Sequence, residues 1–149
     1  MDRYDSPDPI PLPDKDDEFS RADLIFTGVD HSGPSFQARV YFDNPDADES
    51  TPLDPEAGYA GSFWIFGHGG CYGDEGHCEV PTEPRDPFDY RPPHKLSPAT
   101  KTVIVTDAVA RRADADSVQV TVVPVVNKGE KAKREDVLHF DAVRLVTYE

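Results

Sequence analysis

Ser35-Phe-Gln-Ala-Arg-Val-Tyr-Phe42 is the stretch that decides the fold of this 149-residue chain. Its side chains alternate in character, and an extended strand turns successive side chains to opposite faces. The alternation therefore predicts a β-strand with one face in a core and the other toward water. The expected core set is Phe36, Ala38, Val40 and Phe42, and the expected outward set is Ser35, Gln37, Arg39 and Tyr41.

Short apolar runs of similar period lie on both sides of this strand, each bounded by Gly, Pro, Asp or Asn. Further strands are expected at 22–27, 58–66, 101–106, 117–126 and 137–148. The aromatic-rich run 58–66 is expected to be central and to anchor the core, and 101–106 to be buried. Pro124 should mark an edge or a strand end, and Asp107 should cap a short helical turn through Arg112.

Such strands, with long connections and at most one short helix, predict an all-β fold. We expect one antiparallel β-sandwich, jelly-roll-like or cupredoxin-like, over residues 21–149. Residues 1–20 carry alternating prolines followed by acidic residues. We expect them to form an extended, solvated, acidic Pro-rich arm or linker and no part of a sheet, because proline fixes φ and removes a donor.

The charge balance narrows the classes of partner. The chain carries 29 acidic and 15 basic residues, a formal charge of −14. This charge repels phosphate backbones and anionic lipid surfaces, so neither nucleic acid nor membrane is an expected partner. The start of the chain is unlike a secretory signal, and no apolar run approaches the roughly 20 residues that span a bilayer. We therefore expect a soluble chain that is cytoplasmic, or exported only with a partner.

The segment His68-Gly-Gly-Cys-Tyr-Gly-Asp-Glu-Gly-His-Cys78 is the main candidate for chemistry. His68, Cys71, His77 and Cys78 are ligand types for copper or zinc, and the glycines would let the loop wrap around one ion. The spacing matches no zinc-finger or zinc-ribbon pattern. A local Cys71–Cys78 disulfide and two unlinked thiols are the alternatives, and copper is the candidate cofactor.

Other polar motifs are interpreted as structural. His31 and Ser32 follow an acid, but adjacent residues of one turn rarely form a catalytic triad, so a hydrolase is rejected. His94 is expected in a loop, and His139 on the surface or in the core. The acidic run 44–50 lacks the glycine and terminal glutamate of a calcium loop, so we expect a solvated turn.

Three stretches together resemble the C-terminal β-sandwich domain of tyrosinases and plant polyphenol oxidases, the type 3 copper enzymes. They are Gly58-Tyr-Ala-Gly-Ser-Phe63 leading to Gly67-His-Gly-Gly, Lys101-Thr-Val-Ile-Val-Thr-Asp107, and Ser117-Val-Gln-Val-Thr-Val-Val-Pro124 with the strand that follows. The resemblance covers 22–148. The cysteine pair departs from the plant pattern.

The resemblance implies a noncatalytic domain that packs on a helical copper domain and shields its entrance, sometimes assisting copper loading. The family's dicopper centre needs six histidines on a helical core, and this chain has five in all. Tyr72 would be the bulky side chain inserted into the copper-site mouth. The partner is then a type 3 copper catalytic domain, in cis or in trans.

Two alternatives from other classes stay open. One is a free-standing copper-binding module that uses the loop from His68 to Cys78. The other is a structural, partner-binding sandwich whose loop is held by the local disulfide. No enzyme activity is expected of this chain under any of the three hypotheses.

Overall fold

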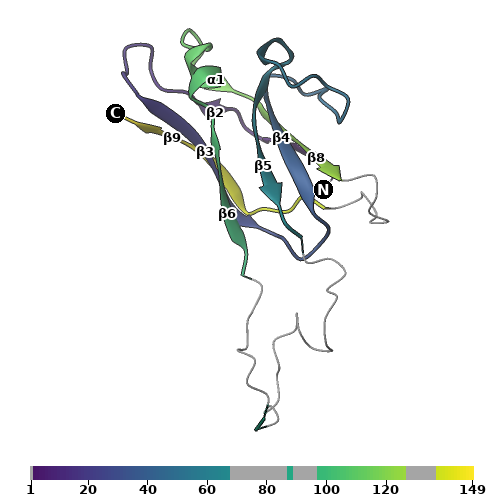
Figure 1. Cartoon of the computed structure of the whole chain (residues 1–149). Helices are drawn as coiled ribbons and strands as arrows, with labels where there is room; N and C mark the ends of the chain where they lie inside the picture. Colours follow the sequence, from purple (N-terminus) through teal and green to yellow (C-terminus); the bar gives the residue numbers. More distant parts are fainter. Residues whose placement is uncertain (1, 68–86, 89–96, 127–136) are drawn as a thin grey trace.

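Two antiparallel sheets pack face to face in the computed structural model, which describes residues 2–67, 87–88, 97–126 and 137–149 (Figure 1). The four-stranded sheet has the order β1 (Tyr4–Asp5), β8 (Val120–Val126), β4 (Phe36–Phe42) and β5 (Tyr59–Ile65). The three-stranded sheet has the order β6 (Ala99–Ile104), β3 (Arg21–Val29) and β9 (Ala142–Tyr148). A small ribbon pairs β2 (Ile10–Pro11) with β7 (Ser117–Val118).

The helical content of the described residues is one 3₁₀ turn, η1 (Pro55–Ala57), and one short helix, α1 (Thr106–Ala110). All the strand pairings are antiparallel. The predicted all-β antiparallel sandwich is therefore confirmed. Within the described ranges, neither helical segment has the length and apolarity that a membrane crossing needs.

The core lies between the two sheets, and β4 supplies it as predicted. Phe36, Ala38, Val40 and Phe42 are all buried. Leu24 and Phe26 of β3 and Val120 and Val122 of β8 join the same cluster. Tyr41, expected toward water, is also buried, because it lies under the segment that follows β4 and forms a second small cluster with Ala47 and Val123 on the outer face.

The N-terminal segment differs from the expected free arm, because parts of it belong to sheets. Tyr4 is paired with Val122 across β1 and β8, and Ile10 with Val118 across β2 and β7. The Leu12 amide donates to the Asp116 carbonyl at 2.9 Å. Each pairing spans only two residues, and prolines at or near both strands limit the backbone donors available to extend them.

The strand expected to be central, 58–66, and the strand expected to be buried, 101–106, both correspond to edge strands of the described sheets. β5 is the last strand of one sheet, and β6 the last strand of the other. Phe63 and Ile65 of β5 point into the core, but Trp64 is 63% exposed. Similarly, Val103 is buried in β6 while its neighbour Ile104 is 59% exposed. The density of apolar residues suggested burial on both faces, whereas only one face of each strand is covered.

Of three further boundary predictions, two need correction. Asp107 lies in the first turn of α1, whose N-cap is Val105 without a side-chain cap bond. Pro124 lies at a local edge, one of its two predicted positions, because β8 continues to Val126 while β1 accompanies it only at Thr121 and Val122. The last strand begins at Ala142, not 137, although Val137 and Leu138 are buried in the core.

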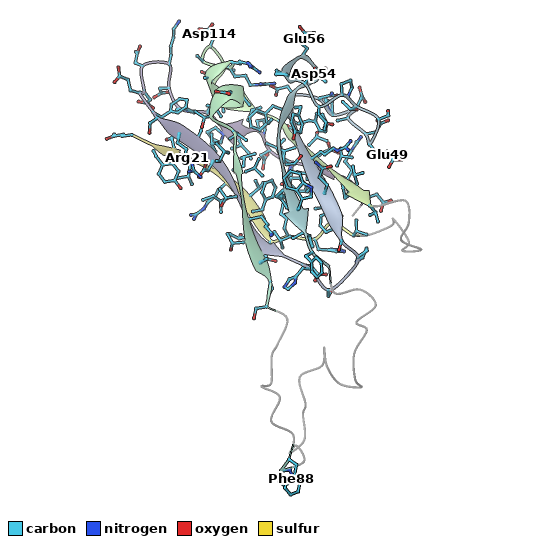
Figure 2. The ribbon with its side chains drawn as sticks, in the orientation of Figure 1. Arg21, Glu49, Asp54, Glu56, Phe88 and Asp114 are labelled. Atoms are coloured by element: carbon cyan, nitrogen blue, oxygen red, sulfur yellow. The ribbon has the colours of Figure 1, made fainter. Side chains whose placement is uncertain are left out.

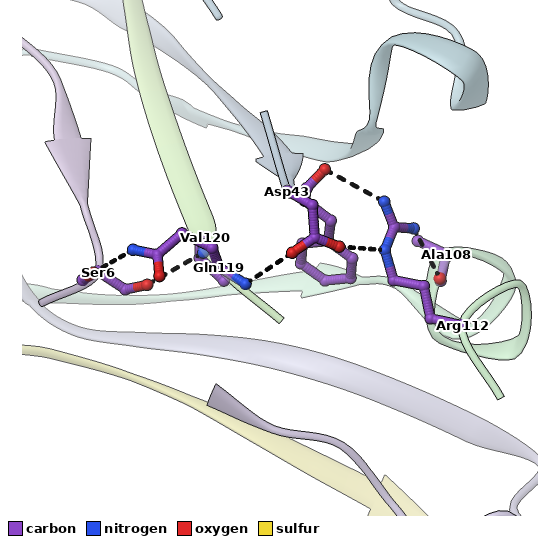
Figure 3. Close-up of polar contacts among 7 residues, drawn as sticks. Ser6, Asp43, Ala108, Arg112, Gln119 and Val120 are labelled. Carbon is purple, nitrogen blue, oxygen red and sulfur yellow. Dashed lines mark hydrogen bonds and ion pairs between the residues drawn. The ribbon is translucent and has the colours of Figure 1, made fainter. Parts of the chain in front are cut away.

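Asp43 follows β4 and joins three separate parts of the chain (Figure 3). Its carboxylate accepts from the Arg112 Nε at 2.9 Å and from the Gln119 backbone N–H at 2.9 Å. The Gln119 side chain in turn donates to the Ser6 carbonyl, and the Ser6 Oγ accepts from the Val120 N–H. These contacts connect the N-terminal segment, the end of β4 and the turn after α1.

Candidate functional site

The outer face of the four-stranded sheet presents an exposed aromatic side chain beside a row of polar ones. Cross-strand pairing places Val125 opposite Gln37, and Gln37 opposite Trp64. In the next row Arg39 is paired with Ser62. We call the surface formed by these five residues the Trp64 face. Phe66, two residues after Trp64 and 84% exposed, extends it beyond the end of β5.

Hydrogen bonds hold the polar side chains of the Trp64 face in place. Arg39 Nε donates to Gln37 Oε1 at 3.1 Å, and Gln37 Nε2 donates to Ser62 Oγ at 3.2 Å. The hydroxyls of Ser62 and Tyr59 are 2.9 Å apart. Arg39 Nη1 also donates to the Glu49 carbonyl at 2.9 Å. A partner that docks here meets side chains that are already ordered, so less conformational entropy is lost on binding.

The segment after β4 covers the other half of this outer face. The Tyr41 hydroxyl donates to the Thr51 carbonyl at 3.0 Å, and burial raises the pKa of Tyr41. Asp48 accepts from the backbone and side chain of Ser50, and these hydrogen bonds lower the pKa of Asp48. The acidic run 44–50 thus uses Asp48 to close a turn, as the sequence predicted for this run.

At the end of the sandwich where β5 ends, the turn after β3 holds His31. Its Nε2 lies 2.7 Å from the Ser97 carbonyl, so this nitrogen carries the proton. The Ser32 hydroxyl donates to the Asp30 carboxylate at 3.0 Å. Ser32 is therefore oriented by the acid and not by the imidazole, which agrees with the rejection of a catalytic triad.

Asp30 is the charged centre of this turn. Burial opposes its ionisation, but hydrogen bonds from the Ser32 backbone and hydroxyl, with His139 and His31 nearby, lower its pKa overall. The Asp30 backbone N–H donates to the His139 carbonyl at 2.9 Å. His139, expected on the surface or in the core, thus lies just before β9, where its backbone helps to position the turn.

The predicted metal loop lies outside the described residues. This applies to His68, Cys71, His77 and Cys78, to the alternative Cys71–Cys78 disulfide, and to Tyr72 and His94. Over the ranges that the structure does describe, no group of three or more His, Cys, Asp or Glu side chains is arranged to hold a metal ion. The metal, disulfide and shielding predictions therefore stay predictions.

The sequence interpretation missed Trp64 as a surface residue, although a signal for it was present. In the run Phe63-Trp-Ile-Phe66 every side chain is apolar, so composition alone favours burial on both faces. Alternation along β5 still separates Phe63 and Ile65 from Trp64 and Phe66.

Phe88 is another exposed aromatic residue of the described chain, and Figure 2 shows that it lies far from the sheets and therefore outside the Trp64 face.

An exposed tryptophan beside fixed polar groups suits binding to another protein. Trp, Tyr and Arg are the residue types that most often dominate the binding energy of protein interfaces. Trp64 and Arg39 lie on this face, with Tyr59 hydrogen-bonded at its border. The surface therefore has the composition of an interaction site.

Comparisons with known proteins bear on the fold. No protein-family model matches the chain, and no curated protein matches it. Among solved structures, the chain is similar to a recombinantly expressed latent aurone synthase, a polyphenol oxidase, with a TM-score of 0.54 and 15% sequence identity. The similarity covers 99% of this chain and 24% of that one. The chain thus spans about a quarter of the polyphenol oxidase that it matches, and it shares that part's fold.

Proposed function

We propose that this chain is a noncatalytic domain that binds a type 3 copper, phenol-oxidising domain and covers the entrance to its active site. The observation that carries the proposal is the fold similarity, which takes in 99% of this chain but only 24% of a polyphenol oxidase. A fold that accounts for about a quarter of an enzyme suits an accessory role beside the catalytic part. That polyphenol oxidase is a latent enzyme, and a domain that covers an active-site entrance would account for latency.

The Trp64 face gives this proposal a docking surface. Trp64 is 63% exposed, and the neighbouring Gln37 and Arg39 are held by hydrogen bonds. Burying a large aromatic side chain that costs little conformational entropy is an efficient source of binding energy. The net charge of −14 additionally favours a partner surface with basic residues around the contact.

The test is to titrate the purified full chain into a purified cognate type 3 copper domain and to measure binding and phenol oxidation together. We expect 1:1 binding and a matching loss of oxidation. Trp64→Ala should weaken binding by about 2 kcal/mol, roughly 30-fold in Kd, because interface tryptophans typically contribute this much. Leu53→Ala is the matched control, since Leu53 is an exposed apolar residue that lies outside the Trp64 face.

Each result bears on one part of the proposal. No binding, or binding without any loss of phenol oxidation, would overturn the covering role. Binding and inhibition that Trp64→Ala and Leu53→Ala affect equally would keep the role but reject the Trp64 face as the docking surface.

A further inference from the structure

An open groove of about 1240 Å³ lies between the N-terminal segment, α1 and the end of β9. Figure 1 shows α1 and the C-terminus at the end of the sandwich opposite to the end of β5. The groove is therefore separate from the turn that holds Asp30 and His31. Its volume exceeds the roughly 300–1,000 Å³ of small-molecule sites. An extended peptide fits such a space better than a small ligand does.

The groove is a built feature of the fold, because both of its walls are anchored. The wall formed by residues 12–20 is tied at one end by the Leu12 amide to Asp116, and at the other by the Ser20 amide to Tyr148 at 2.7 Å. Between these points Asp14 and Asp17 close a turn, with the Asp17 amide donating to the Asp14 carbonyl at 2.9 Å. The opposite wall is α1, whose Val109 is buried in the core.

The lining combines apolar and acidic side chains. Its apolar residues are Leu12, Phe19, Val109 and Ala110; Leu12 and Val109 are buried beneath it, so Phe19 and Ala110 supply the accessible apolar surface. Carboxylates come from Asp14, Asp16, Asp17, Glu18 and Glu149. Within the described part of the chain, none of these five carboxylates forms an ion pair.

The two basic residues of the lining already form ion pairs with carboxylates outside the groove. Lys15 Nζ lies 3.1 Å from Asp114 Oδ1, and Arg112 Nε lies 2.9 Å from Asp43 Oδ2. Neither Asp114 nor Asp43 lines the groove. The lining therefore presents an excess of unpaired negative charge next to apolar surface.

We propose that this groove binds a basic peptide segment of a partner protein, with Lys or Arg side chains against the carboxylates and an apolar side chain against Phe19 and Ala110. The complementarity is both electrostatic and apolar, which selects a cationic, amphipathic segment over a simple cation. The inference is independent of the Trp64 face, and it stands whether or not a copper domain is the partner.

The probe is a fluorescently labelled octapeptide of alternating Lys and Leu, titrated with the full chain and followed by anisotropy. We expect saturable 1:1 binding that weakens as salt rises, and no binding of the Glu-Leu peptide. Asp16→Asn with Glu18→Gln, both exposed, should raise Kd about three- to tenfold, because exposed charge pairs contribute modestly. Replacing Leu by Ser in the peptide should raise Kd further.

Asp46→Asn with Glu56→Gln is the matched control, since it removes the same charge from exposed positions outside the groove. It should change Kd less than twofold. Ala110→Arg, which places a cation on the exposed side of α1, should abolish binding while the folded fraction, measured by circular dichroism, stays unchanged. Absence of saturable binding would overturn the proposal, as would equal weakening by the two acid-to-amide double variants.

Discussion

Arg112 Nε donates to Asp43 Oδ2 at 2.9 Å, and the same guanidinium donates to the carbonyls of Phe42 and Ala108 (Figure 3). One side chain thus fastens the turn after α1 to the end of β4, 70 residues away along the chain. Asp43 itself has a φ of 55°, a left-handed conformation that Asp and Asn tolerate better than other non-glycine residues. Asp43 therefore has two roles: it adopts the positive φ at the end of β4, and it holds Arg112 of the turn after α1.

Replacing Asp43 tests this relationship. Asp43→Ala removes the acceptor for Arg112 and for the Gln119 N–H, and leaves a residue poorly suited to positive φ, so we expect a loss of about 1–3 kcal/mol in the free energy of unfolding. Asp43→Asn keeps one of the two acceptor oxygens and the backbone tolerance, so it should cost less than Asp43→Ala. Urea denaturation measures both. Equal costs would show that the ion pair alone matters.

Gly61 lies where the edge strands β5 and β6 of the two sheets approach each other closely. A β-carbon on Gly61 would lie 2.5 Å from Cγ1 of the buried Val103. Gly61→Ala should therefore destabilise the fold by about 1–3 kcal/mol, through overpacking and because L side chains rarely adopt its φ of 154°. Gly33→Ala is the control, because nothing lies within 4 Å of its added β-carbon. Thermal melts that shift equally for both variants would contradict the close approach.

The fold was predictable to the extent that it depends on local alternation. Phe36 and Val40 are buried as their spacing in β4 predicts. The pairing of Tyr4 with Val122 was not predictable, because a two-residue strand has no period and its partner lies more than a hundred residues away. For the same reason the Asp43 contacts and the groove appear only once distant segments are brought together.

In the candidate site, too, the features that depend on local alternation were predictable and those that depend on strand pairing were not. The orientation of Trp64 could have been deduced from alternation with Phe63, had the aromatic density not favoured burial on both faces. The hydrogen bonds of the Trp64 face could not have been deduced from the sequence, because Gln37 reaches Ser62 only through the register between β4 and β5. Register between two strands depends on their whole apolar pattern and on the connection between them.

Stability should depend on pH through Asp30. Because its pKa is lower in the folded chain than in the unfolded one, ionised Asp30 stabilises the fold at pH values above its unfolded pKa. This contribution is lost as the pH falls through the folded pKa. Asp30→Asn should therefore be less stable than the wild type at neutral pH, and the difference should shrink in acid. Urea midpoints of both proteins from pH 7 to pH 3 measure this difference in stability. A difference that stays constant over this range would contradict the role given to ionised Asp30.

The loop from His68 to Cys78 can be tested by an anaerobic Cu(I) titration against a competing chelator. If the two thiolates and two imidazoles hold copper, replacing Cys71 and Cys78 by serine should abolish tight binding, since thiolates are the preferred Cu(I) ligands. If the cysteines form a disulfide, the untreated protein should weigh about two hydrogens less than the reduced one and bind no Cu(I) before reduction. Unchanged affinity in the double variant would reject the metal site.

Trp64 offers a direct optical test of the docking surface, because it is the only tryptophan in the chain. At 63% exposure its emission should resemble that of a water-exposed indole and should be quenched efficiently by acrylamide. Binding of a type 3 copper domain at the Trp64 face should shift the emission to shorter wavelength and protect it from quenching, because the indole leaves water. Any tryptophan of the copper domain should be replaced by phenylalanine, so that the emission reports on Trp64 alone. A complex that forms while the Trp64 emission and quenching stay as in the free chain would mean that the partner docks elsewhere.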